Sequence, residues 1–569
     1  MTNVDYESYW NVRARRLSRR RLLHGVGVTA VGAAAVSLVG CGDDDDDANE
    51  PDLVATAAPS AQATEQPRAG GVLRQADGAD PTHFSPFHQP ADAPLWNVWR
   101  RHSGYWDTLW SMRESDDPLN QVQLRLAESI EQPDELTYIV KMREAFFHNQ
   151  PLSASNSKVN GRMLTAEDVV ARYAFIRKPP AVSNTLINSQ LTVTALEPLR
   201  LQFKTSVPAG LFYEASNSGA MLRGQEVPRE MLDEETLKND VPIGTGLFMF
   251  KSIQLGSSEE AVRNPGYFLK DHPYLAGKQF TLVPDPAARE VAFRAGQLDY
   301  LEFVDVKQAD AVTADMGSRI KHIAFPTSKG ISCVMNLKRP PFNDVRVREA
   351  VYRGIDVDRL IRIVWFGDAV RTGYFSDAAT ARFPLGYKAV EQYVGYDKAR
   401  AKQLLDASNY DGHTLAFVIP NDTPSLADAA RLIAEDLQAI GFKTELQPEA
   451  RNIFLKRISP KPGDFDFTLA GLQDYELAQS KTGNFFKNGT LEDPEIDALL
   501  ASIITTVDNE QRKVQSQRFE LLMAQRYSPL VPLLRTIGHV GWSSRVKGLD
   551  FEASKAGVGG WQPNMWLDT

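Results

Sequence analysis

A strand–helix–strand pattern in residues 414–447 constrains the fold of this chain more than any other stretch of its sequence. "TLAFVIP" (residues 414–420) is a short apolar run typical of a buried strand, and "FKTELQ" (residues 442–447) alternates as a strand does. Five apolar residues between them recur at spacings of four, three, four and three: Leu426, Ala430, Ile433, Leu437 and Ile440. They form one apolar helix face, with Thr423 and Pro424 suited to its start and Gly441 to its end. The pattern predicts a right-handed βαβ unit with parallel strands.

Elements of both kinds are expected on each side of residue 330, which predicts an α/β protein with two lobes. Strands are expected within residues 70–76, 137–148, 199–205, 247–253, 297–303 and 464–472. Helices are expected within 164–176, where Thr165 and Asp168 have capping-box spacing, within 284–295, which Gly296 closes, and after Pro340 and Pro341, where Asn343 or Asp344 is the cap. Val347, Ala350 and Val351 would form the inward face of that last helix. Gly244 and Gly246 predict a tight turn.

The first 40 residues have the features of an export signal. Residues 26–40 are uncharged but number only about 15, whereas a membrane-spanning helix needs roughly 20 apolar residues. A cluster of arginines precedes this run, as in the n-region of a signal peptide. The segment "SRRRLL" resembles the twin-arginine export signature, with Arg19 and Arg20 as its arginine pair. We therefore expect residues 1–40 to be a signal peptide.

A lipid attachment site and a tether are expected next. "LVGC" ends at Cys41 and resembles a lipobox, in which the cysteine thiol accepts lipid. Asp43–Asp47 can be read as a calcium site, but a run of like charges is typical of a solvated tail. Residues 41–69 lack the apolar side chains of a core and predict a flexible tether. The glycines of Gly25–Gly27 lack the preceding strand and the following acidic residue of a dinucleotide-binding loop.

Charge and cysteine content exclude some functions. The chain has 72 acidic and 63 basic residues, and loss of the signal segment would take its formal charge from −9 to −13. Such acidity argues against a nucleic-acid partner, which requires basic patches. The chain has two cysteines. Once Cys41 is lipidated, Cys333 has no disulfide partner, and its place in the apolar run "ISCVMNL" predicts that it is buried.

A series of segments then identifies a family. They include "GGVLRQADGADPTHFSP", "PIGTGLFMFKSI", "PDPAAREVAFRAGQLDYLEF", "MNLKRPPFNDVRVREAVYRGIDVDRLI" and "IAEDLQAIGFKTEL". The most telling are the GTG turn, the A-x-x-x-G-x-x-D-Y piece and the P-F-N-D-V-R-V-R-x-A segment, and all occur in a shared order. By these motifs the chain resembles the family 5 extracellular solute-binding proteins, which are peptide- and nickel-binding receptors of ABC importers. The resemblance spans nearly all of residues 70–569.

The resemblance implies an α/β periplasmic-binding-protein-like fold of type II, in its large three-subdomain form, with mixed sheets and a ligand cleft between lobes. The expected organisation is a signal peptide (1–40), a lipidated tether (41–69), lobe I (70–330, with an inserted subdomain at about 110–245), lobe II (331–533) and a return to lobe I (534–569). Hinge strands are expected near 325–335 and 530–540.

The resemblance also implies a function. We expect an extracytoplasmic lipoprotein, anchored through Cys41 to the periplasmic or outer face of the cell membrane, that captures a solute and delivers it to ABC permease subunits. It would be a monomer without cofactor or enzymatic activity. A peptide is the expected solute, and a nickel chelate, an oligosaccharide or a sensor role are alternatives. An extracytoplasmic hydrolase is a further alternative, although the sequence contains no GxSxG and no HExxH motif.

Asp474 and Tyr475 are the first candidate ligand contacts. In the peptide-binding branch of the family, an Asp-Tyr pair after the corresponding strand supplies a carboxylate to the amino terminus of the peptide. In this chain Leu472 and Gln473 stand between Gly471 and the pair, where the branch usually has a tryptophan and one more residue. A solvated loop tip is therefore an alternative role for the pair.

A second set of candidates lies near the start of the mature chain. In the family, the loop containing Asp80, Pro81 and Thr82 lines the cleft and offers backbone hydrogen bonds to ligand, and Tyr105 and Trp106 would add an aromatic wall. The spacing of Trp96, Trp99, Trp106 and Trp110 equally suits the core face of a helix. His83 and His88 are an isolated pair of histidines, which is more often structural, and a metal site needs three or four ligands, so no metal site is expected. Residues 152–162 read as an insertion of undetermined role.

Overall fold

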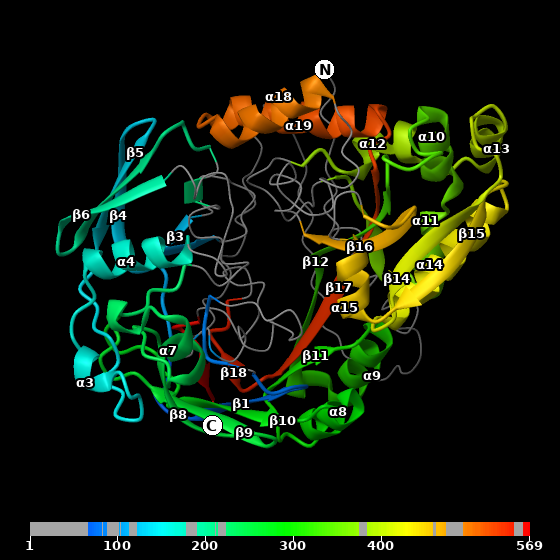
Figure 1. The fold of residues 1–569 in the computed structure, drawn as a ribbon. Helices are drawn as coiled ribbons and strands as arrows, with labels where there is room; N and C mark the ends of the chain where they lie inside the picture. The colour runs from blue at the N-terminus through cyan, green and yellow to red at the C-terminus, as the bar shows by residue number, and fades with distance from the viewer. Residues whose placement is uncertain are drawn as a thin grey trace, which may run out of the picture. The chain divides into compact units, whose positions relative to one another are not determined.

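The predicted βαβ unit is present in the computed structural model of the chain (Figure 1). β14 (Thr414–Pro420) and β15 (Lys443–Glu449) pair in parallel, and α14 (Pro424–Gln438) connects them. Pro424 occupies the first turn of the helix, and Gly441 follows its end with a φ of +115°, which side chains other than glycine rarely adopt. The prediction for this unit is confirmed.

The structure describes residues 66–81, 83–87, 102, 104–112, 122–177, 191–210, 212–213, 224–374, 384–458, 463–473, 493–550 and 562–568. These residues belong to one unit, Gln66–Thr569. The signal segment, Cys41 and the tether up to residue 65 lie outside the described residues, as do Arg19 and Arg20.

A seven-stranded mixed sheet contains the βαβ unit together with two much longer strands. Its order is β11–β17–β12–β16–β14–β15, and β13 also pairs with β17. The remaining strand bounds are β11 Tyr300–Phe303, β12 Ile320–Met335, β13 Ala369–Arg371, β16 Phe467–Gln473 and β17 Leu530–Ser543. β12 and β17 run antiparallel side by side, with a register shift between Pro326 and Gly330 (Figure 1).

These two strands connect separate hydrophobic cores. One core draws only on residues between Ile331 and Leu534, and we call it the 331–534 core. Two others draw on residues from Leu73 to Ile320 and from Val540 to Leu567, and we call them the flanking cores. Each long strand has one end in the 331–534 core and the other end in a flanking core. The register shift therefore lies where the chain passes from one core to another.

Two further sheets lie in the first half of the chain. The first has the order β1–β10–β9–β8, with bounds Val72–Asp77, Gly277–Leu282, Ser258–Arg263 and Phe248–Gln254. The second is antiparallel, β4–β5–β7–β6, with bounds Ala127–Asp134, Thr137–Met142, Arg200–Thr205 and Leu191–Glu197. Two small ladders pair β2 (Trp110–Met112) with β3 (Val122–Leu124) and β18 (Val546–Lys547) with β19 (Trp566–Leu567).

The other described helices are mostly short. Their bounds are α3 Asn156–Val159, α4 Ala166–Ile176, α7 Glu234–Asn239, α8 Pro286–Arg294, α9 Val306–Met316, α10 Val345–Gly354, α11 Val357–Val364, α12 Tyr387–Val394, α13 Lys398–Asp406, α15 Arg451–Ile458, α18 Pro494–Thr505 and α19 Asn509–Gln525. Aspartate carboxylates cap many of them: Asp344 accepts a hydrogen bond from Arg346 N–H at the start of α10, as one of the two expected caps. At α4, the Asp168 carboxylate accepts from the Thr165 N–H at 3.0 Å.

The described residues bear on two expectations about the first half of the chain. The helix suggested by the tryptophan spacing is wrong at its second end, because Trp110 begins β2 and Trp106 precedes it in an irregular segment. Both are nevertheless buried, as a core role requires; Trp96 and Trp99 lie outside the described residues. Periodicity could not separate a strand from a helix at these tryptophans, because buried tryptophans suit both.

Residues 152–162 contain α3 and are held by Asp240, whose carboxylate accepts from the Ser153 hydroxyl at 2.8 Å.

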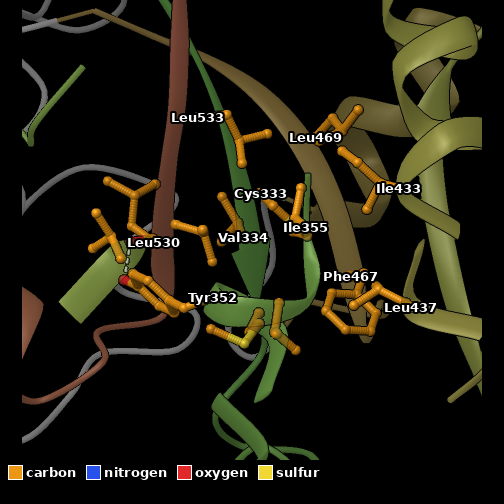
Figure 2. Packing of buried hydrophobic residues seen from close by; sticks show 14 of the residues in the cluster. Cys333, Val334, Tyr352, Ile355, Ile433, Leu437, Phe467, Leu469, Leu530 and Leu533 are labelled. Atoms are coloured by element: carbon orange, nitrogen blue, oxygen red, sulfur yellow. Dashed lines mark hydrogen bonds between the residues drawn. The ribbon is translucent and has the colours of Figure 1, made fainter. Parts of the chain in front are cut away.

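The 331–534 core packs α14 and α10 against the central sheet (Figure 2). Ile433 and Leu437 of α14 lie toward Phe467 and Leu469 of β16, and all four are buried. Cys333 is fully buried as predicted, and burial raises the pKa of its thiol to about 12, so the thiolate is suppressed at neutral pH. In the part of the chain that the structure describes, no helix is both long and apolar enough to cross a membrane.

The apolar face of α14 yields a stability prediction. Leu437→Ala should lower the free energy of unfolding by about 2–5 kcal/mol, because it leaves a cavity in a fully buried position. Asp428→Ala on the exposed face of the same helix should change it by less than about 0.5 kcal/mol. Denaturant unfolding of both variants measures the difference, and equal stabilities would contradict the packing described.

Candidate functional site

The GTG turn and the segment around Tyr105 pack backbone against backbone. The Gly246 N–H donates to the carbonyl of Tyr105 at 3.0 Å, and the Phe248 N–H donates to the carbonyl of Gly104 at 3.0 Å. A Cβ at Gly244 would lie 2.0 Å from the Tyr105 carbonyl oxygen, and one at Gly246 would lie 2.3 Å from that of Gly104. Both positions therefore need glycine because another stretch of backbone occupies the space that a side chain would fill.

Two buried polar side chains hold this turn from its other side. The Asn264 amide donates to the carbonyl of Gly246 at 2.9 Å, and Nε2 of His148 lies 3.1 Å from the same oxygen. Burial lowers the pKa of His148 to about 4, so the ring is neutral at physiological pH and Nε2–H is the donor. The expected tight turn is thus present, and the carbonyl of Gly246 is hydrogen-bonded within the fold.

Tyr105, an expected ligand contact, lies in a flanking core with an exposed fraction of 1%. Its hydroxyl donates to Oε1 of the buried Glu259 at 2.6 Å, and Nε2 of His102 lies 3.4 Å from Oε2 of the same carboxylate. The phenol therefore satisfies a buried carboxylate, which is a structural role. The sequence suggested an aromatic wall, and Tyr105 and Trp106 do lie edge to face with ring centroids 6.0 Å apart.

The hydroxyl of Tyr105 is hydrogen-bonded, but the polar atom of Trp106 is not bonded to any described residue. The indole Nε1 is buried, yet it has no hydrogen-bond partner within the described part of the chain. Oγ1 of Thr245, at the centre of the GTG turn, is in the same situation. The two residues are close, because a Cβ at Gly244 would lie 2.6 Å from Cδ1 of Trp106. A buried donor without a partner lowers the stability of a protein by roughly 1–3 kcal/mol. A ligand that accepted a hydrogen bond from Trp106 would remove this cost, and contact of Trp106 with a ligand stays a prediction.

The sequence did not predict a role for Asp107, a buried titratable residue beside Trp106. Burial raises the pKa of Asp107 to about 7, against the opposing charge of Arg125 and a hydrogen bond from the Tyr267 hydroxyl at 3.4 Å. Asp107 also receives a backbone contact, because the Glu226 N–H donates to its carbonyl at 2.8 Å. The one available signal was an aspartate inside the apolar run "YWDTLW". A carboxylate with a shifted pKa occurs in structural hydrogen-bond networks as well as in functional sites.

The loop with Asp80 is tied to a neighbouring turn. Oδ2 of Asp80 accepts a hydrogen bond from the N–H of Gly256 at 2.6 Å, and Gly256 has a φ of +77° in the turn between β8 and β9. Asp80 therefore fixes a left-handed turn, and Pro81 beside it is half-buried. Thr82 lies outside the described residues. Contact of this loop with ligand stays a prediction.

Asp474 and Tyr475 also lie outside the described residues. The strand that leads to them is described: β16 ends at Gln473, which pairs with Lys329 of β12. Lys329 belongs to the register shift where β12 passes between cores. Within the same shift, the hydroxyls of Thr327 and Thr536 are 2.9 Å apart and join β12 to β17. The strand before the Asp-Tyr pair thus ends beside β12, one of the two strands that connect the cores.

No group of three or more histidine, cysteine, aspartate or glutamate side chains suited to a metal ion occurs within the described ranges. His83 is among these residues, and His88 is not.

A comparison with protein families agrees with the fold. Residues 121–490 match the model of the bacterial extracellular solute-binding proteins, family 5 Middle. The chain belongs to the family 5 bacterial extracellular solute-binding proteins. This family consists of extracytoplasmic receptors for substrates, so the expectation of a solute-binding protein is confirmed.

Two proteins illustrate the range of this family. The oligopeptide-binding protein AppA of Bacillus subtilis (strain 168) is 25% identical over 429 residues, which cover 71% of this chain and 74% of AppA. Its structure in complex with a nonapeptide has a TM-score of 0.67 at 22% identity, covering 89% of this chain and 100% of that one. NikZ from Campylobacter jejuni in complex with Ni(L-His) has a TM-score of 0.64 at 17% identity, covering 84% and 95%. The expected family 5 fold is confirmed.

The GTG turn gives the second prediction. Gly244→Ala should lower the free energy of unfolding by at least about 1–3 kcal/mol, because its Cβ would overlap the Tyr105 carbonyl and the Trp106 ring. Gly266→Ala is the matched control, since its Cβ would meet only Asn264 at an ordinary 3.6 Å. Chemical denaturation compares the two, and a tolerated Gly244→Ala would show that the turn and the Tyr105 segment do not pack as described.

Proposed function

We propose that this family 5 protein is the peptide-binding subunit of an ABC importer. The observation that carries the proposal is the alignment with an oligopeptide-binding protein over 429 residues, which exceeds two thirds of both chains. The sequence motifs point to the same branch, because the Asp-Tyr pair of that branch has a counterpart at Asp474 and Tyr475. The protein acts by binding and release, without covalent chemistry.

The proposed mechanism is a clamp. The 331–534 core and the flanking cores serve as two lobes, and β12 and β17, which pass between them at a register shift, serve as the hinge. A ligand that contacts both lobes favours the closed state by its higher affinity for that state. The closed receptor then delivers the solute to permease subunits.

Asp474 is the proposed contact for the amino terminus of the peptide. A carboxylate and an ammonium group inside a closed cleft form a charge-assisted hydrogen bond. Asp474 follows the last residue of β16, which pairs beside the hinge, so a ligand held there would lie next to the strands that move. The loop of Asp80 to Thr82 would add backbone hydrogen bonds, and Nε1 of Trp106, which has no partner within the described ranges, would donate to a ligand.

Solutes that copurify with the protein test the proposed class directly. Mass spectrometry of material released from the purified chain should detect peptides, and calorimetry with a synthetic copy of the most abundant one should show saturable binding. Recovery of a nickel chelate or an oligosaccharide instead would replace the peptide by that solute, because NikZ shares this fold with a bound nickel complex. Hydrolysis of the added peptide would favour the enzyme alternative.

The third prediction concerns Asp474. Asp474→Asn should weaken binding of the copurified peptide by about 2–5 kcal/mol, because the peptide ammonium would lose its charged partner in a desolvated place. An amino-terminally acetylated copy of the peptide should bind both forms with the same affinity. Calorimetry provides both values. If Asp474→Asn binds the free-amine peptide normally, the pair is a solvated loop tip as in the alternative reading.

The proposal includes a route of export and a membrane anchor. We propose that Arg19 and Arg20 direct export of the folded chain and that lipid on Cys41 anchors it at the outer face of the cell membrane. A lipid chain contributes roughly 0.8 kcal/mol for each buried CH₂ group, and stable anchoring needs more than one chain. Residues 42–69 would form the tether, and at about 5–6 Å × √n it reaches on the order of 30 Å.

The fourth prediction follows from this anchor. Cys41→Ser should move the protein from the membrane fraction to the soluble extracytoplasmic fraction, since the thiol that accepts lipid is lost. Replacing both Arg19 and Arg20 by Lys should instead leave the chain in the cytoplasm with its signal uncleaved. Cell fractionation and mass of the mature amino terminus distinguish these outcomes. Unchanged membrane association of Cys41→Ser would contradict lipid anchoring.

A further inference from the structure

One contact between the cores lies far in sequence from β12 and β17. Residues 209 and 212 belong to a flanking core, where Ala209 and Phe212 are buried. They follow β7 and lie against the carboxyl-terminal end of α18, a helix whose Ile503 belongs to the 331–534 core. The N–H of Gly210 donates to the carbonyl of Ile504 at 2.8 Å. That carbonyl is one of the last four of α18, which have no partner within a helix.

The contact is close enough to require glycine. A Cβ at Gly210 would lie 1.9 Å from the carbonyl oxygen of Thr506, 2.7 Å from its carbonyl carbon and 3.2 Å from the carbonyl oxygen of Ile503. All three atoms are backbone, so they cannot move aside as a flexible side chain can. Gly210 does not have a positive φ, so its own conformation would accept alanine. The demand for glycine therefore comes only from the approach of α18.

The loop that carries Gly210 is firmly held on its own side. The ring of Phe212 stacks on that of Tyr138 of β5 with centroids 3.8 Å apart, and the Tyr138 hydroxyl donates to the carbonyl of Ala209 at 3.3 Å. The end of α18 is held equally on the other side, because Arg512 of α19 donates to the carbonyl of Thr506 at 3.0 Å. Each partner is thus a preformed surface, and the two surfaces meet through the hydrogen bond from Gly210 to Ile504 and tight backbone packing.

We propose that Gly210 and the end of α18 form a clasp that is made when the clamp closes and broken when it opens. The inference rests on the proposed clamp, because it assigns this contact to the closed state. Glycine at position 210 allows the two backbones to meet, and the bond from Gly210 to Ile504 then contributes to closure. An alanine would be harmless in the open state and would clash in the closed one.

The fifth prediction is the test of this clasp. Gly210→Ala should leave the stability of the ligand-free protein unchanged, because the open state relieves the clash, and should weaken binding of a mixture of nonapeptides at least about tenfold. Gly266→Ala is the control for the added methyl group and should change neither quantity. Ile504→Ala, which trims a side chain packed at the clasp without adding bulk, should weaken binding by a smaller factor. Denaturation and fluorescence titration provide the two measurements.

A distance measurement separates failure of the clasp from failure of the proposed function. Spin labels at Lys204→Cys and Glu510→Cys, two exposed positions, would report the separation of β7 from α19 in the chain carrying Cys41→Ser. Cys333 is fully buried and should not take the label. Gly210→Ala should populate longer distances than the parent. If it does so while no nonapeptide binds either form, the clasp holds and the peptide assignment fails. Unchanged distances, or a loss of ligand-free stability, would show a permanent contact and overturn the clasp.

Discussion

The antiparallel pairing of β12 with β17 is the interaction on which the rest of the structure depends. These two strands are the shared members of a sheet whose other strands belong to one side or the other: β16, β14 and β15 on the side of the 331–534 core, and β11 toward the flanking cores. Because the ladder is continuous except at the shifts between Pro326 and Gly330 and between Ile331 and Ser332, it holds the cores together while leaving one short region with fewer paired backbone groups. The proposed hinge needs both properties at once.

The buried polar groups of the flanking core hold segments of the chain to one another. Glu259 accepts the hydroxyl of Tyr105, and Arg172 forms a bidentate pair with Glu226 at 3.0 and 3.1 Å. Buried pairs of this kind add little net stability, but they penalise any packing that leaves one partner unmatched. They therefore fix how the segment around Trp106 and the GTG turn meet, and that geometry positions Nε1 of Trp106, which has no hydrogen-bond partner among the described residues.

Local signals predicted local structure well. The helix face from Leu426 to Ile440, the Asp344 cap and the GTG turn were all predictable, because each depends on residues within one or two turns of chain. The role of Tyr105 was not predictable, because its partner Glu259 is 154 residues away and no local sequence pattern indicates that the two residues pair. The tryptophan spacing failed at Trp110 for a related reason: burial is visible in sequence, but the element that achieves it depends on β3 as a partner. Of the candidate site, Asp474, Tyr475 and Thr82 rest on family resemblance, since they lie outside the described residues.

Glycine shows most clearly how sequence and function are connected in this chain. Gly441 and Gly256 are explained by their positive φ, and Gly244 by backbone packed against it within a single core. Gly210 has neither explanation inside its own core, because the atoms that exclude a side chain belong to the end of α18. A residue whose identity is required only by a surface on another core reports on how the two cores meet. Under the proposed clasp, such a residue constrains motion more than stability, since the cost of changing it appears only when the surfaces come together.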